Sequence, residues 1–193
     1  MKRHSLISTL IILGLLFPAV SSAQTELGFQ GVGFMAGLVA PENLDATVGF
    51  GLIADLGTFT EQIALEANLN YWSQSEGMSG FGEVSIRDIA FGGKTKYFFP
   101  MTNSSLRPFA GAGLSLHFVK AEVTTEEIDL GGGFIIPGTS VGDSSTKLGL
   151  DLGGGMATSI SEKTDFIGEL WYGVVSDINQ FSFKLGVLYK LGI

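Results

Sequence analysis

The chain lacks cysteine altogether and is poor in basic residues. Without cysteine there is no disulfide framework, no thiolate metal site and no cysteine for attaching a lipid. Its 11 Lys and Arg residues stand against 19 Asp and Glu residues, which gives a formal net charge of −8. This balance excludes the strongly basic type of nucleic-acid-binding protein. With 45% hydrophobic residues, the chain is also too apolar for an intrinsically disordered protein.

Long hydrophobic runs are equally absent after the N-terminus. The one early run, residues 6–17, is shorter than the roughly 20 residues of a membrane-spanning helix. A basic start precedes this run and Ser21-Ser22-Ala23 follow it, which is the three-part pattern of a secretory signal peptide. We therefore predict that residues 1–23 are a cleaved signal peptide and that residues 24–193 form one exported domain.

Apolar residues recur at every second position along much of this domain, the pattern of strands with one apolar face. The last segment shows it most clearly, and the same alternation predicts eight strands in all. They are residues 27–38, 47–56, 63–71, 88–99, 107–118, 147–157, 164–175 and 181–193. Short connections at 57–61, 100–105 and 161–163 alternate with long, acidic ones at 72–82 and 123–145. This rhythm is typical of an up-and-down antiparallel barrel.

The residues on the less apolar face of these strands indicate which face meets lipid. The less apolar face is rich in the chain's 28 glycines and carries charges of both signs, which suits the interior of a narrow barrel. Aromatic residues flank the apolar face, as bilayer interfaces select. They are Tyr97, Phe99, Phe166 and Tyr189 at the short-turn end, and Tyr71, Phe118, Tyr172 and Phe181 at the long-loop end. We predict an all-β fold, an eight-stranded antiparallel up-and-down transmembrane β-barrel; the alternative is a secreted β-sandwich or lipocalin-like barrel with an apolar core.

Two adjacent segments resemble a known family. The sequence KTKYFFP at 94–100, followed by LRPFAGAGLSLHF at 106–118, resembles the fourth-to-fifth-strand hairpin of small outer-membrane β-barrel domains of the OmpA/OmpX type. The resemblance implies a Gram-negative outer membrane, with both termini periplasmic and the long loops extracellular. It also implies a C-terminal signal for the barrel-assembly machinery, carried here by Phe183 and Tyr189, with Ile193 at the end where the family usually has Phe.

Charged residues on the inward face are expected to pair, because unpaired ions in a narrow lumen are costly. Glu66 faces Lys94 and Lys96 on the next strand, and Asp151, Glu169 and Lys184 lie on three successive strands with the same inward parity. The predicted lumen charge network is Glu66, Asp88, Lys94, Lys96, Arg107, Asp151, Glu169 and Lys184. Such a network fills a barrel of eight strands and favours a plugged lumen. A gated ion path through a breakable salt bridge is the alternative.

Ser115 and His117 share one strand face, and with an acid such as Glu169 they could form a hydrolase site. We interpret His117 instead as a lumen histidine in a hydrogen-bonded network. No catalytic, metal or cofactor-binding residue is predicted, and no cofactor. The acidic connection 123–145 carries an apolar Phe-Ile-Ile patch that could dock a partner or dip into the membrane surface.

The sequence therefore predicts an integral outer-membrane protein, not an enzyme, with a structural or surface-interaction role. The alternative function is a small channel or conduit for small or apolar solutes. Expected partners are outer-membrane lipids and lipopolysaccharide, with the barrel-assembly machinery during insertion. We expect a monomer that binds no nucleic acid.

Overall fold

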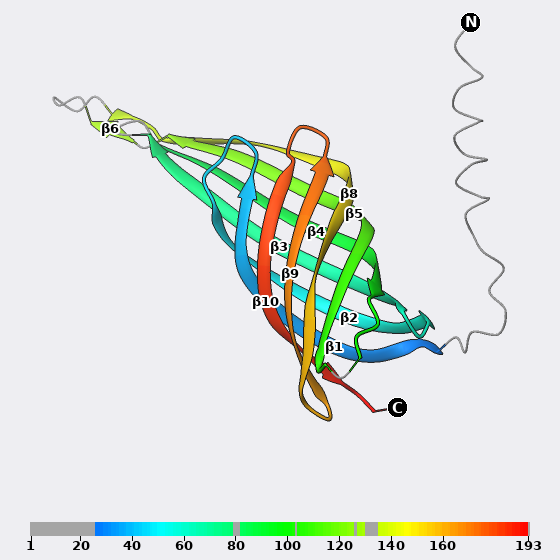
Figure 1. Ribbon diagram of the computed structural model, residues 1–193. Helices are drawn as coiled ribbons and strands as arrows, with labels where there is room; N and C mark the ends of the chain where they lie inside the picture. Colours follow the sequence, from blue (N-terminus) through cyan, green and yellow to red (C-terminus); the bar gives the residue numbers. More distant parts are fainter. Residues whose placement is uncertain (1–25, 79–81, 103, 126, 130–134, 193) are drawn as a thin grey trace, which may run out of the picture.

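Eight long antiparallel strands close into a barrel, as predicted, in the ring order β1-β10-β9-β8-β5-β4-β3-β2 (Figure 1). The computed structural model describes residues 26–78, 82–102, 104–125, 127–129 and 135–192. The strands are β1 (Glu26–Pro41), β2 (Thr47–Thr60), β3 (Ile63–Met78), β4 (Gly82–Phe98), β5 (Leu106–Thr125), β8 (Thr139–Ser161), β9 (Thr164–Val175) and β10 (Gln180–Lys190). Two short strands, β6 (Ile128–Asp129) and β7 (Ile135–Ile136), pair with each other. The predicted signal peptide lies outside the described residues.

The first and last strands of the chain join the ring. β1 and β10 pair antiparallel in unbroken register from Gly31↔Lys190 to Pro41↔Gln180. We call the end of the barrel with Glu26 and Lys190 the terminus end, and the opposite end the hairpin end. The barrel therefore closes without an edge strand along its shared length.

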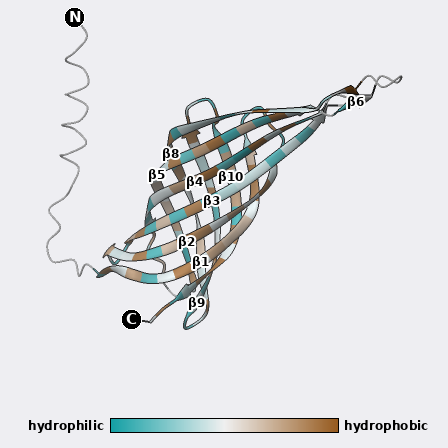
Figure 2. Ribbon diagram, turned by 180° about the vertical axis from the view of Figure 1, so that it is seen from behind, coloured by the Kyte–Doolittle hydropathy of each residue, from teal (hydrophilic) through white to brown (hydrophobic). Residues whose placement is uncertain are grey.

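Apolar and polar residues alternate along the strands (Figure 2), and the large apolar side chains lie mainly on the outer face. On β5, Leu114, Leu116 and Phe118 are exposed, whereas Ser115 and His117 between them are buried. No helix in the described part of the chain is long and apolar enough to cross a membrane.

The interior also contains an apolar layer that the strand pattern did not predict. Its residues are Met35, Ile53, Phe109, Ala157, Ile167, Trp171 and Leu188, with Phe98 packed against them. Trp171 fits because glycines oppose it: a Cβ at Gly153 would lie 2.7 Å from the indole ring, and one at Gly111 would lie 3.0 Å from it. Glycine on the inner face thus makes room for one large ring across the lumen.

The two long connections predicted from sequence are mostly strand, which corrects their interpretation as loops. β3 continues to Met78 and β4 begins at Gly82, while β5 and β8 stay paired as far as Thr125↔Thr139. We call the described residues of 73–87 and 120–146 the projection. It extends β3, β4, β5 and β8 beyond the other strands at the hairpin end (Figure 1). The alternation in these segments is hidden by small and acidic residues, so periodicity did not reveal it.

One ion-pair cluster braces the outer face of the projection. Glu122 Oε1 accepts a hydrogen bond from Ser140 Oγ at 2.7 Å, and Glu122 Oε2 lies 2.9 Å from Lys120 Nζ and 3.7 Å from an Arg87 nitrogen. The Ser140 hydroxyl and then the Lys120 ammonium hold the pKa of Glu122 below its ordinary value. A carboxyl with a lowered pKa supports the folded hairpin at neutral pH, and this support is lost as the pH falls through the lowered pKa.

Candidate functional site

A cluster of ion pairs crosses the barrel interior. Lys96 Nζ on β4 lies 2.6 Å from Glu66 Oε2 on β3 and 3.1 Å from Glu169 Oε2 on β9. Lys94 Nζ lies 3.6 Å from Glu169 Oε1. All four side chains are buried. Glu66 and Lys94 are opposite in the β3–β4 register, yet the closer contact of Glu66 is with Lys96.

Aromatic rings complete this cluster. Lys94 Nζ lies 4.0 Å from the centroid of the Trp171 ring, and Lys96 Nζ lies 4.8 Å from that of Phe109. A buried ammonium over an aromatic face gains electrostatic stabilisation from the ring. The ion pairs and rings together fill the middle of the lumen.

Lys184 forms a hydrogen bond with an amide side chain. Its ammonium donates a hydrogen bond to Asn70 Oδ1, and Asn70 Nδ2 in turn donates to Asn68 Oδ1 at 2.8 Å. Lys184 lies opposite Glu169 in the β9–β10 register, the ion pairs of Glu169 go to Lys94 and Lys96, and Asp151 is half-buried on β8.

A second charged cluster lies at the terminus end, around a residue that the sequence analysis missed. Asp165 is buried and pairs with Arg107 and with Lys190 Nζ at 2.7 Å, and it accepts a hydrogen bond from Ser159 Oγ at 2.7 Å. Asp165 has the same strand parity as Glu169, so its inward position could have been found from the alternation. Its role depends on Lys190 and Arg107 from distant segments, which the alternation does not reveal.

Three buried polar side chains form a chain of hydrogen bonds near the hairpin end. Ser115 Oγ lies 3.0 Å from His117 Nε2, and His117 Nδ1 lies 2.7 Å from Asp88 Oδ2. The acid beside His117 is therefore Asp88, and the sequence suggestion of Glu169 is corrected. The order Ser–His–Asp has the geometry of a nucleophile activated by a base and an orienting acid. Within the described residues, no group of three or more His, Cys, Asp or Glu side chains could hold a metal ion.

Ser115 borders two cavities. One has a volume of about 380 Å³ and is lined mainly by wall residues such as Phe91 and Leu148. The other, inside the barrel, has a volume of about 30 Å³ and is lined by Trp72, Lys94, Gln180 and Lys184, among others. A cavity of this volume is large enough to hold water. Two of these lining residues are joined by a hydrogen bond, because Trp72 Nε1 donates to Gln180 Oε1 at 2.9 Å. The three side chains of the Ser–His–Asp chain therefore satisfy one another's hydrogen-bonding groups inside the barrel.

We predict that a fluorophosphonate serine probe will not label the folded protein above the level of a Ser115→Ala variant. The physical reason is that the side chains of Ser115 and His117 are buried in the barrel wall and interior. The check is in-gel fluorescence of folded, purified protein, with a soluble serine hydrolase as the positive control. Labelling that disappears in both the Ser115→Ala and His117→Ala variants would instead demonstrate an activated nucleophile.

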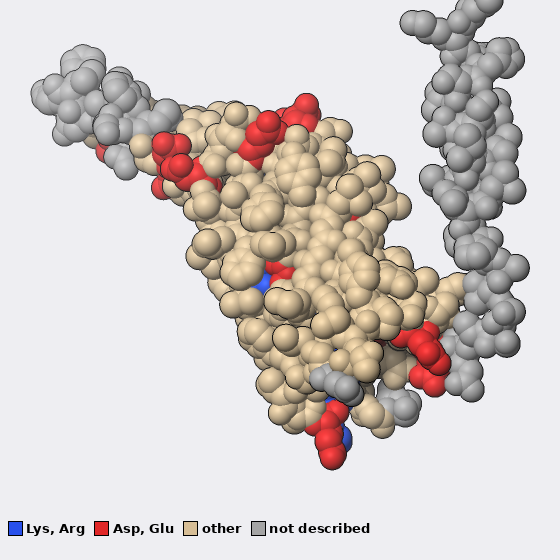
Figure 3. All heavy atoms as spheres, in the orientation of Figure 1, with Lys and Arg blue, Asp and Glu red and all other residues tan. Residues whose placement is uncertain are grey.

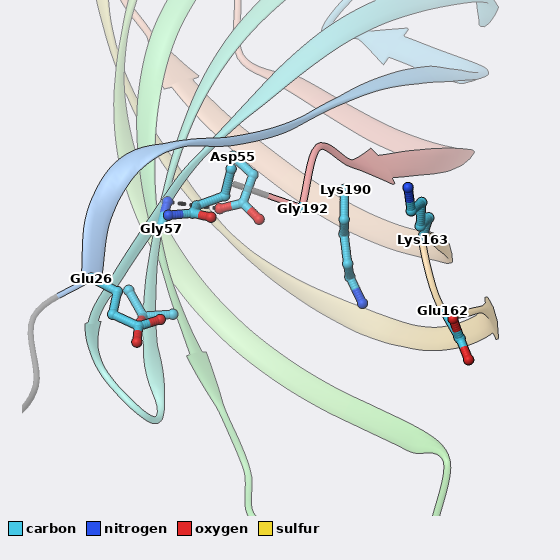
Figure 4. A pocket seen from close by; sticks show the side chains of 9 residues that line it. Glu26, Asp55, Gly57, Glu162, Lys163, Lys190 and Gly192 are labelled. Carbon is cyan, nitrogen blue, oxygen red and sulfur yellow. Dashed lines mark hydrogen bonds between the residues drawn. The ribbon is translucent and has the colours of Figure 1, made fainter.

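Two further cavities lie at the terminus end, and Figure 4 shows residues that line the first of them. One cavity of about 460 Å³ is lined by Glu26, Asp55, Glu162, Lys163 and Lys190, among others. A second, of about 190 Å³, shares Asp55 and Lys190 with it and reaches Glu66 and Lys96. The interior is thus open from the terminus end up to the ion-pair cluster, and the cavity beside Trp72 and Lys184 beyond it is smaller.

The residues expected to form the C-terminal assembly signal lie on the last strand. Phe183 and Tyr189 are exposed on the outer face of β10, and Ile193 lies outside the described residues. Their position on the outer wall leaves them available to another protein or to lipid.

A closed eight-stranded ring with an apolar wall and a salt-bridged interior defines an outer-membrane β-barrel protein. The chain belongs to the outer membrane protein beta-barrel domain family, whose model matches residues 8–190. Its bacterial outer-membrane location follows from this membership and agrees with the prediction from sequence.

Two solved structures have a similar fold. Neisserial surface protein A (NspA) is 19% identical with a TM-score of 0.57, over 83% of this chain and 96% of that one. Ail, the attachment invasion locus protein of Yersinia pestis, is 13% identical with a TM-score of 0.53, over 86% of this chain and 99% of that one. No curated protein sequence matches the chain. At this level of identity the likeness concerns the fold.

Proposed function

We propose that this protein is a surface-interaction protein of the outer membrane with a plugged lumen. The observation that carries the proposal is the projection, a four-stranded sheet that continues past a barrel whose middle is filled by Lys96, Glu66, Glu169 and Trp171. Residues that form neither a pore nor an active site but extend a sheet away from the membrane are best suited to contact another surface.

The proposed orientation places the projection outside the cell and both termini in the periplasm. Residues 1–23 are then the signal peptide and residues 24–193 the mature domain. The apolar wall contacts outer-membrane lipids, lipopolysaccharide surrounds the hairpin end, and Phe183, Tyr189 and Ile193 form the signal for the barrel-assembly machinery. The names of the two similar structures, a surface protein and an attachment protein, support this proposal.

Removing the tip of the projection is expected to abolish attachment and to spare the barrel. In the test variant an Asn-Gly turn replaces residues 124–140, and bacteria carrying this variant or the intact chain are compared on cultured animal cell monolayers. We expect attachment to fall to that of bacteria lacking the protein. A Ser140→Cys variant of the cysteine-free chain, labelled on whole cells with an impermeant maleimide, checks that the tip is outside. Unchanged attachment with a correctly folded barrel would contradict the proposal.

The plugged lumen predicts no steady conductance in planar bilayers. An ion would have to break the contacts of Lys96 with two carboxylates and pass Trp171, in a medium where unpaired charges are costly. Single-channel recording at several voltages makes the measurement, with a general porin as the positive control. Sustained unitary conductance from pure protein would favour the alternative, a small channel.

A further inference from the structure

The edge of β8 within the projection is open. The last pair between β8 and β9 is Gly149↔Val175, but β8 continues to pair with β5 as far as Thr125↔Thr139. Lys147 Nζ still lies 3.2 Å from Asp177 Oδ2 in the turn after β9. Beyond that contact, residues 139–146 have a paired strand on one side only within the described structure.

Two hydrogen bonds indicate which backbone groups face the open side. The N–H of Thr139 donates to Thr125 Oγ1 on β5 at 3.0 Å, so it points into the ladder. The N–H of Ser144 donates to Asp143 Oδ1 at 2.9 Å and so is not used by β5. Because backbone groups alternate sides along a strand, the amides of Ser140, Gly142, Ser144 and Thr146 face outward.

The opposite edge of the projection is more protected. Thr47 Oγ1 donates to the carbonyl of Ser73 on β3 at 2.8 Å. The Gln74 amide reaches the backbone of Asp45 in the β1–β2 connection, at 2.7 and 3.2 Å. The β1–β2 connection therefore covers the start of the β3 edge, and β8 has the exposed edge of the sheet.

Natural sheets usually block such edges with proline, lysine or a bulge. Residues 139–146 contain neither proline nor lysine, their register with β5 has no shift, and Asp143 is their one charged residue. The other side chains are small, apart from Val141. The edge is thus flat and accessible enough to take an added strand.

We propose that the open edge of β8 binds an extended, basic segment of a partner protein by strand addition. This inference rests on the proposed function, which places the projection outside the cell. An incoming strand needs the Ser144 N–H and must displace the Asp143 carboxylate from it. A Lys or Arg side chain on the incoming strand compensates the displaced carboxylate, so the edge selects for positive charge.

The surroundings favour the same partner. Among the described side chains of the projection, acidic ones outnumber basic ones, with Glu76, Glu83, Glu122, Glu127 and Asp143 against Arg87 and Lys120. Figure 3 shows acidic side chains near the tip of the projection. Val84, Val123 and Val141 lie opposite one another in register on the face that carries Asp143. A strand beside Val141 therefore meets an apolar row and, two residues along on the same face, an acidic neighbour, which suits an apolar and a basic side chain at successive positions of one face.

A second copy of this chain fits less well. Two barrels in one membrane share the same orientation, so their β8 strands run in the same up-or-down sense and cannot pair antiparallel across a two-fold axis along the membrane normal. A separate segment has no such restriction. Self-association is therefore an outcome of the test and not the expected result.

The experiment uses the purified full-length barrel in nanodiscs and a fluorescent ten-residue peptide in which valine and lysine alternate along one face and threonine occupies the other. Fluorescence anisotropy measures binding, and amide hydrogen exchange reports on residues 140–146. We expect saturable binding with slower exchange at Gly142 and Ser144. A peptide of the same sequence with alternate amides N-methylated keeps the charge but cannot pair, and it is expected to bind at least tenfold more weakly.

Matched variants of the protein separate strand addition from simple charge attraction. Ser144→Pro removes the outward N–H without removing a β5 bond and is expected to weaken binding at least tenfold, while Ser144→Ala leaves it unchanged. Asp143→Asn is expected to weaken binding of the lysine peptide several-fold more than it weakens binding of a peptide with glutamine at the lysine positions. Heat-modifiable gel mobility confirms that each variant is folded.

Equal binding of the methylated peptide, or of the Ser144→Pro variant, would overturn strand addition. Dimers in place of peptide binding would show that a second copy occupies the edge and would also overturn the proposal. If the protein neither binds the peptide nor dimerises, and the intact chain still mediates attachment, the edge inference fails and the proposed function stands. Peptide binding by a protein that mediates no attachment would support the edge inference and contradict the proposed function.

Discussion

Replacing Lys96 by methionine is expected to lower the free energy of unfolding by about 3–5 kcal/mol. The lysine ammonium bridges Glu66 and Glu169 at 2.6 and 3.1 Å inside the barrel. Without it, two buried carboxylates face each other with only the longer Lys94 contact to Glu169. Urea unfolding in lipid vesicles, followed by tryptophan fluorescence and by gel mobility without boiling, measures the loss.

Two companion variants test whether the effect comes from the unpaired charges. Lys163→Met removes an exposed lysine on the β8–β9 turn and is expected to change stability by less than about 0.5 kcal/mol. Combining Lys96→Met with Glu66→Gln removes one of the stranded carboxylates and is expected to recover part of the loss. A Lys96→Met barrel as stable as the parent would show that the ion-pair cluster contributes little to the fold.

Gly153→Val is the second substitution with a large expected effect, a loss of about 3 kcal/mol or failure to form the barrel. A Cβ at this position would meet the Leu170 carbonyl oxygen and lie 2.7 Å from two ring carbons of Trp171. Gly111 and Lys94 lie against other parts of the ring and restrict its movement. Refolding yield into vesicles and urea unfolding of any folded fraction measure the effect.

Gly77 on β3 supplies a matched control for this prediction. A Cβ there meets no atom within 4 Å, so Gly77→Val makes the same chemical change on a strand with open space. Trp171→Leu in the Gly153→Val background removes the ring and is expected to restore part of the stability. If both glycine variants fold equally well, packing around Trp171 does not limit the size of the residue at 153.

Strand periodicity predicted most of the fold because each wall strand has lipid on one side and the lumen on the other. That contrast fixes which residues alternate, so the eight strands and the inward positions of Glu66, Lys96 and Glu169 follow from the chain alone. The contrast ends at the membrane surface. In the projection both faces meet water, the apolar signal disappears, and strand residues such as 139–146 read as a loop.

Side-chain partners were harder to predict than side-chain directions. Register alone places Lys94 beside Glu66, but the lysine side chain reaches across the lumen to Glu169. His117 joins Asp88 on the neighbouring strand, a pairing that depends on the stagger between β4 and β5. These contacts are set by barrel shear and side-chain length, which a linear pattern does not contain.

The seam between β1 and β10 also constrains how this protein acquires its structure. Gly31 and Lys190 come from opposite ends of the chain, so this ladder has the greatest sequence separation in the barrel. Contacts of such high order cost much loop entropy before they add any stability, and folding through them is slow. Until the 11 residues of β10 have paired, β1 and β9 each have one unpaired strand edge in contact with lipid or water. A chain that lacks this one strand should therefore remain an open, protease-sensitive sheet, so the pairing of β10 with β1 commits the barrel to its final form.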